Sequence, residues 1–352
     1  LGANGNALIQ TPNLDRLAAA GANFNHCFVQ SPVCMPSRVS FLSGRYPSEL
    51  GITHMGVDVQ EDLAIWPHYL RPYGYRSANF GKLHFRTHAN RDHRTRHPAF
   101  GFDQWEISDE PGVYEDAYRA WVRRQAPEQL DHLSVGLPPA TAVYYDVMGI
   151  EDPVVHPAAG ARGDFAGAIA FPGDERYTHT AFVAERTIDF LGRQTGEQPF
   201  LCIAGFYSPH APWVVPQRYL DLYEPAQFPA ADAQQRAAMH GYYAMISEVD
   251  HHIGRILQTL DDAGLAEETI VLYTADHGEW LGDQGRYGKG YPADDPVSRV
   301  PLVVRAPAVV RTQIGRTHDA LIEAVDVLPT LLAALGAPVA PELNGQSVFN
   351  LL

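Results

Sequence analysis

Cysteine, long apolar runs and positive charge are all scarce in this sequence of 352 residues. Its three cysteines are too few for a disulfide framework, so each is either a small buried hydrophobe or a reactive group. No apolar run approaches the roughly 18 residues of a membrane-spanning helix. Lysine and arginine number 26 against 41 acidic residues, and the net charge of −15 disfavours nonspecific nucleic-acid binding. Any bound anion must therefore meet a local positive site.

The remaining composition is that of a folded globular protein, with 45% hydrophobic and 19% charged residues. Short runs rich in β-branched and aromatic residues alternate with longer segments of helical periodicity, which predicts an α/β fold with a mainly parallel sheet. We expect strands at 75–80, 199–206, 269–274 and 300–304, and helices around 182–191 and 246–260.

One long region departs from this alternation. Residues 86–174 contain clusters of Arg, His, Pro and Gly with little periodicity, which is typical of an insertion or lid rather than a sheet layer. We therefore expect a single domain over residues 1–352, with 86–174 as a variable insertion.

Polar residues follow three of the four expected strands directly. His84, His210 and the pair Asp276-His277 stand at these positions. Ligands of open parallel sheets bind beyond the carboxyl ends of the strands, so we expect these side chains to converge at one edge.

Cys34 opens the sequence Cys-Met-Pro-Ser-Arg. Pro36 suits the first turn of a helix and Gly44 its end, which predicts that Cys34 lies at a helix N-terminus. That position favours an anion or a thiolate of low pKa. The alternative is a buried structural cysteine in front of an ordinary helix.

The pattern C-x-P-S-R at 34–38 resembles the signature of the type I, formylglycine-dependent sulfatases of the alkaline-phosphatase superfamily. Further segments resemble that family in the expected order as far as about Leu352, at 11–17, 43–45, 81–84, 208–210, 276–278, 288–290 and 299–301. The resemblance implies an alkaline-phosphatase-like fold, a mainly parallel central sheet sandwiched by helices, as in bacterial arylsulfatases and phosphonate monoester hydrolases.

The same resemblance implies the chemistry of sulfate ester hydrolysis. Cys34 would be oxidised to formylglycine by a formylglycine-generating enzyme. One hydroxyl of the aldehyde hydrate would attack sulfur and release the alcohol. Deprotonation of the other hydroxyl would then expel sulfate and regenerate the aldehyde. A serine has no second hydroxyl on the same carbon and could not release sulfate in this way.

Asp276, His277 and residue 34 would bind one divalent metal ion. The family commonly has asparagine beside this aspartate, whereas His277 matches a variant found in the phosphonate hydrolases. Calcium is our first expectation, with manganese or zinc as alternatives because imidazole suits them better. A simple turn after the strand is the alternative for this pair.

The other residues that match the family would bind the anionic ester or donate a proton to it. Lys82 and Lys289 would bind the nonbridging oxygens of the ester, and Arg38 would brace residue 34 and the metal. His84 and His210 would contact the ester, and one of them would protonate the leaving oxygen. Taken singly, a lysine is usually a solvated surface charge and a histidine usually structural.

The family pattern also contains parts that these residues do not match. A buried strand ending in Asp-Asp or Asp-Gln normally supplies further metal ligands, so we expect the sequence to start inside the domain. It also stops about where a smaller C-terminal subdomain would begin.

Three functions remain open from the sequence. Sulfate monoester hydrolysis is favoured by C-x-P-S-R together with Lys82 and His84, and phosphonate monoester or phosphodiester hydrolysis by His277. An inactive anion-binding homologue is the third.

The substrate would be a small sulfate ester; we expect no nucleic acid or membrane partner and leave open a homo-oligomer. No signal peptide is evident at the start, which favours the cytoplasm, with the periplasm as the alternative.

Overall fold

The computed structural model describes residues 1–86, 95–111, 115–133, 167–307 and 314–352. Its strands are β1 (Ala22–Phe28), β2 (Arg76–Gly81), β3 (Gln104–Ile107), β4 (Ile169–Ala170), β5 (Phe200–Gly205), β6 (Val214–Val215), β7 (Val271–Thr274), β8 (Arg299–Arg305) and β9 (Arg316–Glu323). Its α-helices are α1 (Pro12–Ala19), α2 (Cys34–Ser43), α3 (Pro47–Leu50), α4 (Trp66–Leu70), α5 (Ala117–Gln125), α7 (His179–Leu191), α8 (Gln217–Leu220), α9 (Ala233–Asp262), α10 (Asp295–Ser298) and α11 (Val327–Ala334).

The strands form two main sheets and one small one. The larger sheet has the order β7-β8-β1-β9, in which β8 runs antiparallel to both of its neighbours and β1 and β9 are parallel. The second sheet, β3-β2-β5, is parallel throughout, and β4 pairs with β6. The prediction of a mainly parallel α/β fold is confirmed.

All four expected strands are present, as β2, β5, β7 and β8. One prediction about the region 86–174 is wrong, because its residues Gln104–Ile107 form β3 and extend the second sheet beside β2. A strand of four residues is too short to produce a recognisable run. Whether the rest of 86–174 forms a lid stays a prediction, since 87–94, 112–114 and 134–166 lie outside the described residues.

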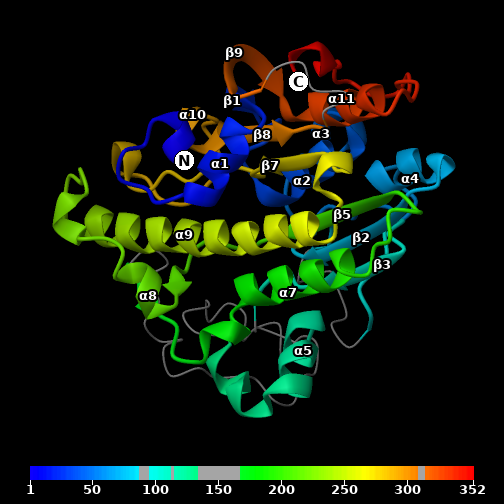
Figure 1. Ribbon diagram of the computed structural model, residues 1–352. Coiled ribbons are helices and arrows are strands. Elements are labelled where there is room, and N and C mark those ends of the chain that lie inside the picture. Colours follow the sequence, from blue (N-terminus) through cyan, green and yellow to red (C-terminus); the bar gives the residue numbers. More distant parts are fainter. Residues whose placement is uncertain (87–94, 112–114, 134–166, 308–313) are drawn as a thin grey trace.

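Helices cover both faces of the sheets, as predicted. Leu14 and Leu17 of α1 pack on Val303 of β8, with α9 beside them. On the opposite face, α2 and α11 contribute to the largest apolar core. In Figure 1 the long α9 crosses the molecule and α7 lies beside it, covering β2 and β5. Because α9 packs against both α1 and α7, one helix spans the two sheets.

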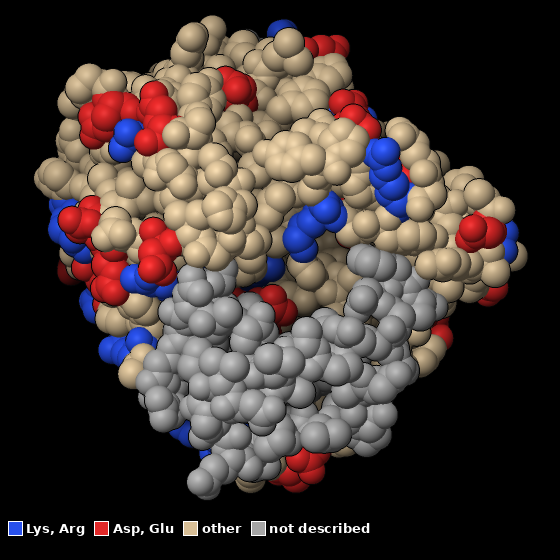
Figure 2. Space-filling model, turned by 180° about the vertical axis from the view of Figure 1, so that it is seen from behind, with Lys and Arg blue, Asp and Glu red and all other residues tan. Residues whose placement is uncertain are grey.

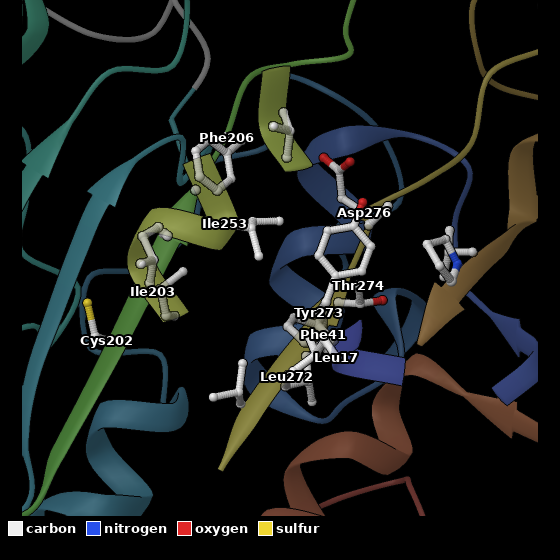
Figure 3. Close-up of a pocket in the computed structure, with 18 of the residues that line it drawn as sticks. Leu17, Phe41, Cys202, Ile203, Phe206, Ile253, Leu272, Tyr273, Thr274 and Asp276 are labelled. Carbon is white, nitrogen blue, oxygen red and sulfur yellow. The ribbon is translucent and has the colours of Figure 1, made fainter. Parts of the chain in front are cut away.

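The expected single sheet is divided between β5 and β7. A cavity of about 1500 Å³ lies between these strands and is lined by residues of both. Figure 3 shows Ile203 of β5 and Leu272 of β7 on opposite sides of this cavity, with Asp276 beyond the end of β7. Both strands are rich in apolar side chains but only partly buried, because within the described residues each is paired on one edge alone.

The surface carries both signs of charge. On the face in Figure 2, acidic and basic side chains lie interspersed, and basic side chains border a hollow near the middle of that face. Within the described residues, no helix combines the length and apolar character needed to cross a membrane.

Candidate active site

Cys34 begins α2, as the sequence predicts. Val33 is the extended residue in front of the helix, and Gly44 ends it in the left-handed conformation with φ 68°. Cys34 is 1% exposed. Its sulfur therefore lies at the positive end of a ten-residue helix, out of contact with bulk water.

Four side chains with ionisable nitrogens face the Cys34 sulfur. His277 Nε2 lies 3.0 Å and Lys82 Nζ 4.0 Å from Sγ, and His210 and Lys289 also face the thiol. Burial opposes ionisation of Cys34, but the positive charges of Lys82, His277 and Lys289 outweigh it and hold its pKa well below the usual range. This position stabilises negative charge on the side chain at residue 34.

Arg38 lies one turn along α2 and connects the two sheets. Its Nε donates to Asp276 Oδ2 at 2.6 Å, and one terminal nitrogen donates to the backbone carbonyl of Lys82 at 2.9 Å. Burial of Asp276 favours the neutral acid, but Arg38 and His277 keep the pKa of its carboxyl below its usual range. Ser37 donates to the Asp276 carbonyl. The bracing predicted for Arg38 is therefore directed at Asp276 and at the end of β2.

Cys34, Asp276 and His277 each offer one ligand atom, and these atoms lie within 4.8 Å of one another. The orientation of His277 suits a metal ligand. Its Nδ1 lies 2.7 Å from the carbonyl oxygen of Gly278, which can only accept, so Nδ1 carries a hydrogen and Nε2 is the atom that faces Cys34 and would bind a metal after losing its proton. Burial lowers the pKa of His277, yet the negative charges on Asp276 and Cys34 raise it overall. The same charges favour a bound cation, so the three residues fit a divalent metal.

His210 and Lys289 form the opposite wall. Lys289 Nζ is hydrogen-bonded to His210 Nε2, while His210 Nδ1 lies 2.5 Å from the carbonyl oxygen of Ala211. Burial, together with the charges of Lys289 and Lys82, lowers the pKa of His210. The imidazole is therefore neutral, with its hydrogen on Nδ1 and with Nε2 accepting from Lys289.

Two glycines let the ends of β2 and β5 approach each other. A Cβ on Gly81 would clash with the carbonyl oxygen of Gly205, and a Cβ on Gly205 with that of Lys82. The Lys82 backbone N–H donates to the Gly205 carbonyl at 2.6 Å. This close approach brings the segment carrying Lys82 beside the segment that carries His210.

Lys82 and Lys289 are the only lysines among the 352 residues, which contain 24 arginines. Both face Cys34, and the Lys82 side chain is buried over the Tyr207 ring at 4.9 Å from its centroid. Buried lysines are rare unless they are paired. The use of lysine at these two positions alone is a compositional signal that the sequence analysis did not use.

His84 is placed differently from the other predicted residues. It is 3% exposed and has a left-handed backbone with φ 58°. The backbone N–H groups of Leu83 and His84 both donate to Asp109 Oδ1, at 2.9 and 2.8 Å. These bonds fix the His84 backbone two residues after Lys82. Its role toward an ester stays a prediction.

The family model named "Sulfatase" matches residues 1–337 of this chain. This chain belongs to the sulfatase family. The ulvan-active sulfatase of Formosa agariphila and the arylsulfatase of Clostridium perfringens are each 27% identical to it over its full length. This chain covers 62% and 75% of those two proteins.

Among solved structures, the phosphonate monoester hydrolase of Agrobacterium radiobacter matches with a TM-score of 0.79 and 25% identity. That match covers all of this chain and 74% of the hydrolase. The fold is thus the alkaline-phosphatase-like α/β fold expected from the sequence.

Sequence reasoning missed two buried residues of this region, Tyr207 and Glu248. The Tyr207 ring packs against the His210 ring in a tilted arrangement, with centroids 4.7 Å apart, and also lies beneath Lys82. Glu248, in the middle of α9, is 1% exposed, and its burial raises the pKa of its carboxyl to about 7. A glutamate at this position of a long helix gives no signal of burial, since neither its spacing nor its neighbours form a motif.

Proposed function

We propose that this chain carries the active site of a sulfate monoester hydrolase in which Cys34 is converted to formylglycine. The observation that carries the proposal is the convergence on one buried sulfur of both lysines of the chain and of the pair Asp276-His277. Once oxidised and hydrated, residue 34 would supply an oxygen nucleophile whose second hydroxyl permits release of sulfate.

The two lysines would neutralise the ester. A sulfate monoester has one net negative charge and three nonbridging oxygens, and Lys82 and Lys289 approach residue 34 from different segments. In a buried site, charge-assisted hydrogen bonds of this kind are stronger than in water. They accelerate the reaction where they stabilise the transition state more than the bound substrate.

His210 is the better placed of the two candidate acids. Its Nδ1 hydrogen is committed to the Ala211 carbonyl, so Nε2 is the atom that exchanges a proton inside the pocket. Lys289 already donates to that nitrogen. Lys289 Nζ and His210 Nε2 would share one proton between them, and the pair would give that proton to the leaving oxygen.

Asp276, His277 and residue 34 would hold the divalent metal, with calcium ahead of manganese and zinc. The metal would supply a positive charge that polarises the ester and lowers the pKa of the nucleophile. Arg38 holds the Asp276 carboxylate from the side through Oδ2, which leaves Oδ1 for the metal.

Three ligands are few for such an ion. The cavity between β5 and β7 ends beside Asp276, and an extended segment in that space would pair with both open strand edges. Acidic side chains at the end of that segment would complete the coordination. An Asp-Asp or Asp-Gln pair after an apolar run in the complete reading frame would support this; its absence would contradict it.

Phosphonate monoester hydrolysis is the second candidate, favoured by His277 and by the likeness to the Agrobacterium radiobacter hydrolase. The deciding measurement is the specificity constant for matched nitrophenyl sulfate and nitrophenyl phenylphosphonate, using protein made from the complete reading frame. We expect the sulfate to be preferred. A larger constant for the phosphonate would reverse the ranking and leave the nucleophile and metal assignments in place.

Formylglycine is tested by mass spectrometry of the tryptic peptide that ends at Arg38, after expression with a formylglycine-generating enzyme. We expect this peptide to have the mass of the aldehyde form in place of the thiol form. The fraction of converted peptide should rise in proportion to the activity of the preparation. Full activity in a preparation that contains only unmodified Cys34 would refute the nucleophile.

A further inference from the structure

A chain of buried hydroxyl groups leads from Glu248 to the turn that carries His210. Glu248 lies on α9 and accepts hydrogen bonds from Thr178 Oγ1 at 2.8 Å and Thr180 Oγ1 at 3.2 Å. Thr180 Oγ1 lies 3.0 Å from Ser208 Oγ. Thr178 and Thr180 are at the start of α7, and Ser208 follows β5.

The direction of each bond follows from the number of hydrogens. A hydroxyl has a single hydrogen, and Thr180 gives its hydrogen to Glu248. The bond between Thr180 and Ser208 must then be donated by Ser208. Thr178 likewise donates to Glu248 and accepts the backbone N–H of Ala181, as the N-cap of α7. In its ionised form, Glu248 is therefore the final acceptor of both branches.

Ser208 lies inside the turn that positions His210. The His210 backbone N–H donates to the Tyr207 carbonyl at 3.1 Å, and the Tyr207 hydroxyl donates to the Ala211 carbonyl at 2.9 Å. The same Ala211 carbonyl accepts from His210 Nδ1. Anchoring the Ser208 side chain to α7 thus restrains the turn whose other end fixes the imidazole.

We propose that Glu248 is a positioning residue, which through Thr180 and Ser208 holds the turn 207–211 so that His210 Nε2 points at residue 34. Thr178 provides the control, because its hydroxyl also donates to Glu248 but is not hydrogen-bonded to Ser208 in the turn. The inference rests on the acid role proposed for His210. It makes that role depend on Glu248 as well, a buried carboxylate that does not itself contact the imidazole.

The test compares three variants of the protein expressed from its complete reading frame: Thr180→Val, Ser208→Ala and, as the control, Thr178→Val. Each removes one hydroxyl with little change of volume. Amide hydrogen exchange of the peptide containing 207–211 reports the turn itself. We expect Thr180→Val and Ser208→Ala to speed that exchange about tenfold, while Thr178→Val speeds exchange only in the first turn of α7.

Turnover provides the second readout. With an alkyl sulfate, whose leaving group needs protonation, Thr180→Val and Ser208→Ala should each lower kcat about tenfold, the scale of losing an outer positioning contact. KM and the turnover of nitrophenyl sulfate should change little. The double variant should lose no more than either single one, because both remove the same bond. Glu248→Gln should retain most of the activity, since its amide oxygen still accepts from Thr180.

Two results would overturn the proposal. One is wild-type exchange in 207–211 and wild-type alkyl sulfate turnover in Thr180→Val and Ser208→Ala. The other is an equal loss in Thr178→Val, which would make Glu248 a support of α7 alone. If His210→Gln turns over alkyl sulfates normally, the proposed acid role fails instead, and the exchange experiment still decides whether Glu248 holds the turn.

Discussion

The two sheets contribute unlike halves to the site. Cys34, Asp276 and His277 follow strands of the larger sheet and are joined to one another by short polar contacts and by Arg38. Lys82 and His210 follow strands of the smaller sheet and are held largely by packing on Tyr207, while Lys289 joins them from the segment between β7 and β8. The first half is an anionic cluster suited to a metal, and the second is cationic and suited to the substrate.

This difference affects what a mutation does. In the anionic half, loss of one side chain leaves a buried partner charge uncompensated, so the site itself should collapse. In the cationic half, the aromatic support remains when a cation is lost, so substrate chemistry should suffer while the metal stays bound. The halves are connected by the bond from Arg38 to the Lys82 carbonyl and by the contact of Lys82 Nζ with the Cys34 sulfur.

The largest effect is expected from Asp276→Ala, because it removes a metal ligand and strips Arg38 of its carboxylate. Activity and bound metal should be lost together, measured by turnover and by metal analysis of the purified protein. Asp261→Ala, which removes an exposed carboxylate of α9, is the control and should retain both. Stoichiometric metal in the Asp276 variant would end the assignment.

The second largest effect is expected from loss of a lysine in the cationic half. Lys82→Ala or Lys289→Ala should lower turnover of an aryl sulfate by about a hundredfold or more, as when one preorganised donor is removed. Metal content should stay at the wild-type level. Arg193→Ala, the loss of an exposed cation after α7, should change neither quantity. Loss of metal in either lysine variant would show that the halves are not separable.

His210→Gln should discriminate between substrates. Turnover of an alkyl sulfate should fall about a hundredfold, because the leaving alcohol then departs unprotonated, whereas nitrophenyl sulfate should lose far less. Plotting rate against leaving-group pKa for wild type and variant measures this difference. His54→Gln, at an exposed histidine, serves as the reference. An equal loss for every leaving group would assign His210 to binding.

The smallest expected effect is on stability and concerns Glu248 behind the cationic half. Burial raises its pKa to about 7; Thr178, Thr180 and Arg218 oppose the shift, and Glu175 adds to it. The folded protein therefore retains a proton that the unfolded chain loses, and the free energy of unfolding should fall as pH rises from about 4.5 to about 7.

Relative to Glu248→Gln, wild type should lose about 3 kcal/mol of unfolding free energy across this interval. Urea titrations of both proteins at several pH values, under conditions of reversible unfolding, measure the difference. Parallel pH profiles for the two proteins would mean that Glu248 is ionised throughout.

Sequence alone located the strands whose apolar runs are uninterrupted, and the residues that directly follow them. It missed β1 and β9, because β1 mixes Asn23, Asn25 and His26 with its apolar residues, and the edge strand β9 keeps polar and charged side chains. Packing of a neighbouring strand, rather than periodicity, makes these segments extended.

The same limit holds at the site. The motif at 34–38 and the pair Asp276-His277 gave one half, because the chemistry there requires particular residue types. Tyr207, which packs on Lys82 and His210, and Glu248, which we propose holds the turn of His210, belong to no motif and acquire these partners only through long-range contacts. Such contacts between distant segments depend on the folded arrangement, which no local pattern encodes.

The distribution of lysine turns the cationic half into a chemical handle. With Lys82 and Lys289 as the only side-chain primary amines in these 352 residues, an amine-selective reagent small enough to enter would label the pocket and leave the 24 arginines untouched. Occupancy by a sulfate or a phosphonate would then register as protection from labelling, peptide by peptide. The pocket could thus be titrated with unreactive ligands, without a mutation and without turnover.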